Sequence, residues 1–163
     1  MRKDLLQSMS TVSVDDLADG QVIALLQEHH KKMHEYSPPE SIHALDTNKF
    51  YNPALTFWSA REAGELLGCG ALYALSDTSG EIKAMKTSDT HLRKGVAKSI
   101  LNEIILESGQ RGYTRLYLET GTHAAFLPAI SLYKTAGFVE CAPFGDYNED
   151  PYSVFFVREH QQP

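Results

Sequence analysis

The 163-residue sequence has few of the residues that mark several large classes of protein. It contains only 2 cysteines, Cys69 and Cys141, and they stand far apart, outside any metal-ligand spacing. A disulfide-rich secreted scaffold is therefore excluded, and we expect two buried free thiols in a reducing cytoplasm. No apolar run approaches the roughly 20 residues of a membrane-spanning helix, and no signal peptide is recognised. We therefore expect a cytoplasmic protein with no membrane partner.

Positive charge is also scarce, because 15 Lys and Arg residues stand against 21 Asp and Glu, for a formal net charge of -6. A nucleic-acid-binding domain usually has a basic face, so no nucleic-acid partner is expected. The negative field mildly favours cationic small substrates over anionic ones. A chain of this length with 42% hydrophobic residues can bury a core without disulfide or metal. We expect residues 1–163 to form one domain.

The order of the apolar patterns predicts a mixed α/β fold. Alternation of polar and apolar side chains predicts strands at 11–14, 55–60, 66–73, 81–87, 115–120, 138–142 and 153–158. Apolar stripes predict helices at 22–36, from Pro39 through Leu45, from about Lys94 to Gly109 or Gly112, and at 126–136. Turns are expected at Ser79-Gly80 and Gly121. This order predicts one mainly antiparallel sheet, with helical crossovers in its second half.

The most informative stretch runs from Met85 to Lys98, where a strand and a short loop lead into a helix. The first amides of a helix have no partner within it and carry the positive end of its dipole. Gly95 permits close approach of the backbone, and Arg93, Lys94 and Lys98 add positive charge at the same end. These features predict a diphosphate site; a plain amphipathic helix with a basic first turn is the alternative. The spacing fits neither a P-loop nor a Rossmann fingerprint.

Two motifs in this region and beyond resemble those of the GNAT acetyltransferase superfamily. The run Leu92-Arg93-Lys94-Gly95-Val96-Ala97 is similar to motif A, [Q/R]-x-x-G-x-[G/A], except that Leu92 replaces the usual Gln or Arg. Residues 129–138 are similar to the later A-x-x-L-Y-x-x-x-G-F pattern. With the order of strands and helices, the resemblance covers 11–158, and more narrowly it points to an uncharacterised bacterial subgroup. It implies a mainly antiparallel sheet of about seven strands flanked by about four helices, splayed between the fourth and fifth strands.

The resemblance also implies where the cosubstrate acetyl-coenzyme A binds. In this family it lies in the gap between the splayed strands and contacts mostly backbone groups. The matching positions are Met85, Lys86, Thr87, Arg93, Lys94, Gly95, Val96, Ala97 and Lys98. Many relatives also hold the cofactor arm with an asparagine, but that position is Phe126 here, so this contact must be absent or replaced.

Two residues match catalytic positions of the family. Tyr133 matches the tyrosine that protonates the departing coenzyme A thiolate, and a core aromatic is the alternative role. Glu119 matches a position that serves as base in some relatives, where a carboxylate accepts the amine proton directly or through a water. A solvated charge at the end of a strand is the alternative for Glu119.

The acceptor side of this fold is walled by the first helices and by the loop between the last two strands. The residues expected to line it are His34, Glu35, Ser37, His43, Asp146 and Tyr147. Asp146 could pair with an ammonium group and Tyr147 could pack on the substrate; solvated histidines and an ordinary hairpin tip are the alternatives. His30 and His34 are spaced for a metal, but no third ligand is evident, so no metal is expected.

The resemblance implies an acyl-coenzyme A-dependent N-acyltransferase. It would transfer an acetyl group from acetyl-coenzyme A to a primary amine of a small molecule or amino-acid derivative, by direct attack. A non-catalytic acyl-coenzyme A binding or sensor domain is the alternative: Tyr133 and Glu119 favour the enzyme, whereas Leu92 and Phe126 leave room for the sensor. The identity of the amine, the acyl group and the oligomeric state stay open, although the family often forms homodimers.

Overall fold

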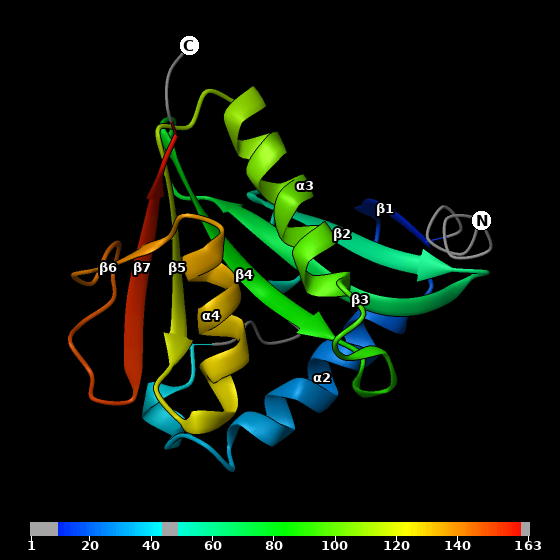
Figure 1. Ribbon diagram of the computed structural model, residues 1–163, viewed down its shortest axis with the longest axis horizontal. Helices are drawn as coiled ribbons and strands as arrows, with labels where there is room; N and C mark the ends of the chain where they lie inside the picture. The colour runs from blue at the N-terminus through cyan, green and yellow to red at the C-terminus, as the bar shows by residue number, and fades with distance from the viewer. Residues whose placement is uncertain (1–9, 44–48, 161–163) are drawn as a thin grey trace.

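The computed structural model describes residues 10–43 and 49–160 and is built on a seven-stranded sheet (Figure 1). The strands are β1 (Ser10–Asp15), β2 (Leu55–Glu62), β3 (Glu65–Ala74), β4 (Ser79–Thr87), β5 (Arg115–Gly121), β6 (Val139–Cys141) and β7 (Ser153–Glu159). They lie in the order β1-β2-β3-β4-β5-β7-β6. Neighbouring strands pair antiparallel except β4 and β5, which are parallel. The expected mixed, mainly antiparallel sheet is confirmed.

Three α-helices occur in the described residues, one fewer than the resemblance implied. They are α2 (Gln21–Met33), α3 (Val96–Gln110) and α4 (Leu127–Thr135). The segment that begins at Pro39 forms only a 3-10 turn, Pro39–Ser41, because Ile42 already has extended backbone angles. The expected continuation to Leu45 lies outside the described residues.

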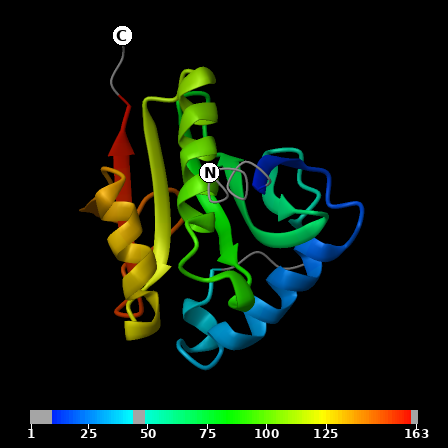
Figure 2. The same ribbon diagram turned by 45° about the vertical axis from the view of Figure 1, so that its right-hand side comes forward.

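Helices cover both faces of the sheet, with α3 and α4 on one face and α2 on the other (Figures 1 and 2). Because side chains alternate along a strand, neighbouring residues of β3 serve different cores. Leu72 packs into the cluster that contains Ile100 and Ile104 of α3. Ala71 packs into the cluster that contains Val22 and Leu26 of α2. Burial on both faces explains why the central strands are apolar with little interruption.

The gap between the fourth and fifth strands is present, and β4 contains the distortion that opens it. Pairing between β4 and β5 runs only from Ser79↔Arg115 to Ile82↔Leu118. The next residues of β4 contain Ala84 in a left-handed conformation (φ 57), opposite a register shift against β3. Such a bulge bends a strand and increases its twist. The two strands then diverge toward the lower edge of Figure 1, which confirms the expected splay.

Several local expectations were wrong. Ser79 begins β4 instead of forming a turn, because its carbonyl accepts hydrogen bonds from the amides of Leu75 and Ser76, which closes the turn earlier. Gly109 lies within α3 and does not end it, whereas Gly112 (φ 82) takes the left-handed position after the helix, which confirms the later of the two expected ends. Gly121 belongs to β5. Both cysteines are free, but Cys141 is only partly buried, since β6 lies at the edge of the sheet.

Candidate active site

The start of α3 forms an open, positively charged cradle. Arg93 (φ 63) and Gly95 (φ 80) are both left-handed, which turns the chain sharply into the helix. No described side chain caps this end, and its first turn carries no acidic residue. A Cβ atom added to Gly95 would meet nothing within 4 Å, so the space beside the start of the helix is open. These features fit an anion such as a diphosphate.

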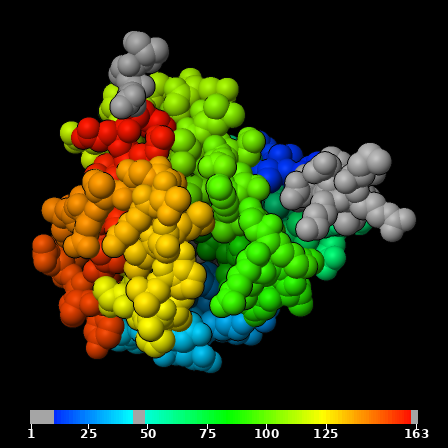
Figure 3. Space-filling model, in the orientation of Figure 1, coloured from blue at the N-terminus to red at the C-terminus, as the bar shows by residue number. Residues whose placement is uncertain are grey.

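The end of β4 adjoins this cradle. Beyond Ile82, the backbone of β4 has no paired strand on the β5 side, which leaves groups of Met85 and Thr87 available to a ligand. The space-filling view shows the surface hollowed between the yellow segment around α4 and the green segment at the start of α3 (Figure 3). The residues predicted to bind the cosubstrate, Met85–Thr87 and Arg93–Lys98, therefore lie together along one side of this gap.

Tyr133 projects from α4 into the core. Its side chain is 7% exposed, and its ring packs edge-to-face on Phe138 with the centroids 5.9 Å apart. Burial raises the pKa of Tyr133 above its ordinary value, so the hydroxyl stays protonated at neutral pH and can donate a proton. The ring is a core aromatic and its hydroxyl is also a possible acid, so the two roles expected from the sequence are compatible.

Glu119 lies on the opposite face of β5 from Leu118, toward α2. Burial raises the pKa of Glu119 to about 7, while Ser153 and Lys83 oppose this by favouring the charged carboxylate. The Ser153 hydroxyl lies close enough to act on Glu119, although it is buried without a hydrogen bond to any described residue. Glu81 and Asp150 raise the pKa of Glu119 further. A partly buried carboxyl group of this kind is not a freely solvated charge, and it is suited to general-base catalysis near neutral pH.

A buried polar cluster beside Glu119 was missed by the sequence analysis. The hydroxyl of Tyr147 donates to Oε2 of Glu81 at 2.6 Å, and Nζ of Lys83 donates to the Tyr147 hydroxyl oxygen at 3.1 Å. Nζ of Lys83 lies 3.3 Å from Oε2 of Glu81, which is 3% exposed. The alternation Glu81-Ile82-Lys83 put both charges on one face of a strand, but it gave no sign that the face is covered.

The predicted acceptor-side residues divide into two groups. The ring of His43 meets Tyr147 edge-to-face with the centroids 5.0 Å apart, so both line the wall near Glu119. Ser37 is partly buried in the loop after α2. In contrast, His34, Glu35 and Asp146 are exposed, and the structure does not bring them to Glu119.

Phe126 makes contacts that differ from those of the asparagine found in many relatives. Its ring lies so close to Gly121 that a Cβ atom added there would be 2.5 Å from Cε2 of Phe126. The ring also packs edge-to-face on Tyr36, with centroids 5.9 Å apart. Phe126 thus joins the end of β5 to the end of α2 through apolar contacts.

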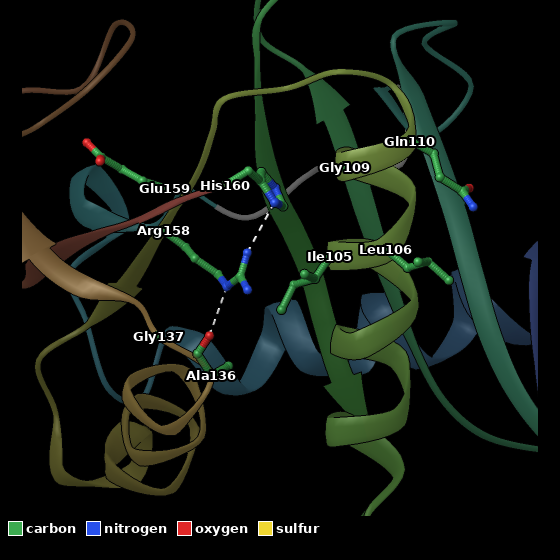
Figure 4. Close-up of a pocket in the computed structure, with 9 residues that line it drawn as sticks. All are labelled: Ile105, Leu106, Gly109, Gln110, Ala136, Gly137, Arg158, Glu159 and His160. Atoms are coloured by element: carbon green, nitrogen blue, oxygen red, sulfur yellow. Dashed lines mark hydrogen bonds between the residues drawn. The ribbon is translucent and has the colours of Figure 1, made fainter. Parts of the chain in front are cut away.

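A separate pocket lies at the other end of α3 (Figure 4). It is lined in part by Gly109, Gly137, Arg158 and His160, with Arg158 bonded to the carbonyl oxygen of Ala136 and to His160. It is remote from Gly95 and from the open ends of β4 and β5, so it is not part of the candidate site. Among residues 10–43 and 49–160, no group of three or more His, Cys, Asp or Glu could hold a metal ion. No helix in those ranges is long and apolar enough to cross a bilayer.

Comparison with known proteins decides the family. Residues 22–138 match the model of the acetyltransferase (GNAT) family. The chain belongs to this family. This GNAT protein is 55% identical over 148 residues to the uncharacterized N-acetyltransferase YsnE of Bacillus subtilis (strain 168), covering 91% of this chain and 98% of that relative.

Two further similarities agree with this assignment. The GNAT protein is 32% identical over 149 residues to the IAA acetyltransferase of Azospirillum brasilense, covering 91% of this chain and 96% of the relative. A crystal structure from Klebsiella pneumoniae subsp. pneumoniae MGH 78578, assigned to the acyl-CoA N-acyltransferases, superposes with a TM-score of 0.75 at 26% identity, covering 93% and 98% of the two chains. The protein is an acyl-coenzyme A-dependent N-acyltransferase, which favours the enzyme over the sensor domain that the sequence left as the alternative.

Proposed function

We propose that this enzyme transfers an acetyl group from acetyl-coenzyme A to a primary amine of a small molecule or amino-acid derivative. The observation that carries the proposal is the position of Glu119, a carboxyl group with a pKa of about 7, where β4 and β5 separate. A base must be unprotonated near the working pH to take a proton from an ammonium group, and a pKa near 7 allows this.

The donor side of the proposal is supported by the cradle at Gly95. Acetyl-coenzyme A carries a diphosphate, and the free first turn of α3 with exposed Arg93, Lys94 and Lys98 fits that charge. The unpaired edge of β4 at Met85 and Thr87 suits backbone contacts to the pantetheine arm. When bound, acetyl-coenzyme A supplies the thioester that is attacked.

The proposed chemistry needs only two side chains to move protons. Glu119 takes a proton from the acceptor ammonium, and the amine nitrogen bonds to the acetyl carbonyl carbon. The carbon–sulfur bond breaks with its electron pair on sulfur, and Tyr133 donates its hydroxyl proton to that thiolate. The nitrogen loses its second proton to solvent, Glu119 releases its proton to solvent and Tyr133 regains one from solvent, which leaves an N-acetylated amine, free coenzyme A and the enzyme in its starting form. No covalent enzyme intermediate is expected.

The remaining assignments belong to the same proposal. His43 and Tyr147, whose rings are in contact, form the inner wall of the acceptor site. The partly buried Ser37 and the exposed His34, Glu35 and Asp146 are kept as proposed contacts of an acceptor that extends outward from this wall. The continuous sheet of the described residues supports one domain over residues 1–163. The two free thiols support a cytoplasmic location. A homodimer and a metal-free reaction are proposed from the family pattern.

The decisive experiment measures release of the free thiol of coenzyme A from acetyl-coenzyme A across a broad panel of amines. A reaction without amine gives the hydrolysis background, and IAA, the compound for which one relative is named, is tested separately from the amines. We expect turnover above background with at least one class of primary amine, and mass spectrometry should identify the N-acetylated product. A protein that binds acetyl-coenzyme A but acetylates no amine in the panel would contradict the proposal.

A further inference from the structure

Lys83 is a largely buried cation beside the proposed base. Its side chain is 17% exposed, so the ammonium group is covered but still reachable. An ammonium group has three N–H donors. Its hydrogen bond among the described residues goes to the Tyr147 hydroxyl at 3.1 Å, and Oε2 of Glu81 lies 3.3 Å away. At least one donor of Lys83 is therefore left for a ligand.

Glu81 compensates the charge of Lys83 only in part. A charge-assisted bond between an ammonium and a carboxylate is typically about 2.7–2.9 Å long, which is shorter than the 3.3 Å seen here. Oε2 of Glu81 already accepts the Tyr147 hydroxyl at 2.6 Å. Lys83 and Glu81 both hydrogen-bond to the Tyr147 hydroxyl, and they do not form a close ion pair with each other. Lys83 can therefore still attract a second anion.

Lys83 also lies directly across the gap from Glu119. The last paired residues of β4 and β5 are Ile82 and Leu118, so Lys83 and Glu119 are the next residue on each strand. Side chains alternate along a strand, so both point to the face opposite Ile82 and Leu118. Neighbouring strands are about 4.8 Å apart before they diverge. A ligand whose amine contacts Glu119 can therefore contact Lys83 with a second group that is only one or two atoms away from the amine.

We propose that the acceptor carries a carboxylate next to its amine, as an α-amino acid does, and that Lys83 binds this carboxylate while Glu119 receives the amine. The inference rests on the proposed function, because it places the acceptor amine at Glu119. An anionic group with two negative charges would bind Lys83 less well than a carboxylate does. Glu81 and Asp150 also act on Glu119, and their negative charges would repel such a group. Lys83 is thus a specificity-determining residue that selects amino acids over simple amines.

Matched acceptors test the carboxylate. L-leucine is compared with L-leucinamide and 3-methylbutylamine, and L-phenylalanine with L-phenylalaninamide and 2-phenylethylamine, by kcat/KM from coenzyme A release. Each set keeps the side chain and the amine while removing the negative charge. We expect at least one amino acid to exceed both of its uncharged partners tenfold or more.

Three variants test the residue. Lys83→Met removes the cation, and the double variant Lys83→Met with Glu81→Gln also removes the carboxylate that the first variant leaves buried without a cation. Lys134→Met removes an exposed lysine of α4 and is the matched control. We expect Lys83→Met and the double variant to lower kcat/KM for the amino acid by ten- to a hundredfold, as for a lost hydrogen bond to a charged group. Lys83 and Glu81 shift the pKa of Glu119 in opposite directions. The amide and the simple amine should therefore change less than twofold in the double variant, and in Lys83→Met they should lose a smaller factor than the amino acid.

Two outcomes overturn the inference. One is a wild-type enzyme that uses the simple amine or the amide as well as the amino acid. The other is a folded Lys83 variant, verified by its melting temperature, that loses the same factor with all three acceptors. The second outcome would assign Lys83 to holding the Tyr147 loop alone.

A binding measurement separates this inference from the proposed function. Calorimetric titration of L-leucine or L-phenylalanine into protein saturated with coenzyme A requires no turnover. Binding that is lost in the double variant but kept in Lys134→Met supports the carboxylate subsite even if no amine is acetylated. Turnover of simple amines with no amino-acid binding keeps the proposed function and overturns the subsite.

Discussion

At the scale of single residues, the burial of the Glu119 carboxylate lowers the stability of the folded protein. A charged carboxylate is more stable in water than in the protein interior, so burial raises the pKa of Glu119 to about 7 from its ordinary value of 4.5. Lys83 and Ser153 oppose this effect without cancelling it. The groups that act on Glu119 therefore come from β4, from β7 and from the loop that contains Asp150.

The first prediction concerns pH. With saturating acceptor, kcat should fall as the pH drops through about 7, because Glu119 becomes protonated and no longer accepts a proton. Glu119→Gln should lower kcat by about 10²–10⁴-fold, the usual contribution of a general base, and should remove this acidic limb. The measurement is a pH–rate profile from pH 5 to 9 for both proteins.

The same residue has a matching effect on stability. Because the folded pKa is raised, the wild type loses stability as the pH rises from 4.5 through about 7, and Glu119→Gln does not. The variant should therefore gain stability relative to the wild type at pH 8 but not at pH 4, as measured by urea unfolding.

In the pH–rate profile, an acidic limb that persists in Glu119→Gln would assign the base to another group.

Tyr133 allows a second residue-scale prediction. Tyr133→Phe keeps the ring that packs on Phe138 but removes the hydroxyl. We expect kcat to fall by about 10²–10⁴-fold, since the thiolate loses its proton donor, while the dissociation constant for coenzyme A changes less than twofold. Calorimetry and the thiol assay measure the two quantities, and unchanged turnover would leave Tyr133 a core residue only.

At the scale of elements, the turn into α3 joins a strained backbone to an open binding surface. Gly95 has φ 80 and faces free space. A side chain at this position would therefore strain the backbone conformation without clashing with its neighbours. The same is true of Gly64 (φ 81) in the hairpin between β2 and β3. The two glycines share a conformation, but only Gly95 lies at the cradle.

This pair gives the third prediction. Gly95→Leu and Gly64→Leu should each lose about 1–2 kcal/mol of unfolding free energy, since L-residues resist the left-handed conformation. Only Gly95→Leu should also weaken coenzyme A binding, by more than tenfold, because its side chain occupies the space in front of the first amides of α3. Calorimetry with folded protein measures this, and tight binding by Gly95→Leu would place the cradle elsewhere.

At the scale of the whole molecule, two glycines of β3 let α3 and the bulged end of β4 come close together. A Cβ atom on Gly70 would clash with Sδ of Met85 and would be 2.8 Å from Cγ2 of Ile100. A Cβ atom on Gly68 would be 2.8 Å from Cγ1 of Val96. The helix that holds the cradle therefore rests on the sheet through positions where no side chain fits.

Gly70→Ala tests this packing. We expect a loss of about 1–3 kcal/mol of unfolding free energy, the usual cost of overpacking a core. Gly109→Ala is the control, because a Cβ there meets nothing closer than 4.0 Å and alanine favours a helix. Urea unfolding should show the control unchanged or slightly more stable; equal stability of both variants would contradict the close approach.

Much of this protein was determined by the sequence alone, because its signals are local. Alternation and helical stripes located all seven strands and the three α-helices, and the motifs at Gly95 and Tyr133 identified the family and the splay. The local pattern predicted the wrong structure where a hydrogen bond or the packing of a residue distant in sequence determined it. Ser79 reads as a turn residue but starts β4, and Gly121 ends a strand under the ring of Phe126.

Only the tertiary structure decided the chemistry of the acceptor side. Tyr147 and Glu81 are 66 positions apart, and their hydrogen bond depends on strand register and on how the last loop folds back onto β4. The same packing buries Glu119 and raises its pKa, and it places Lys83 across the gap from it. A sequence shows which residues share a strand face, whereas burial, and with it the charge state of a carboxyl group, depends on what covers that face.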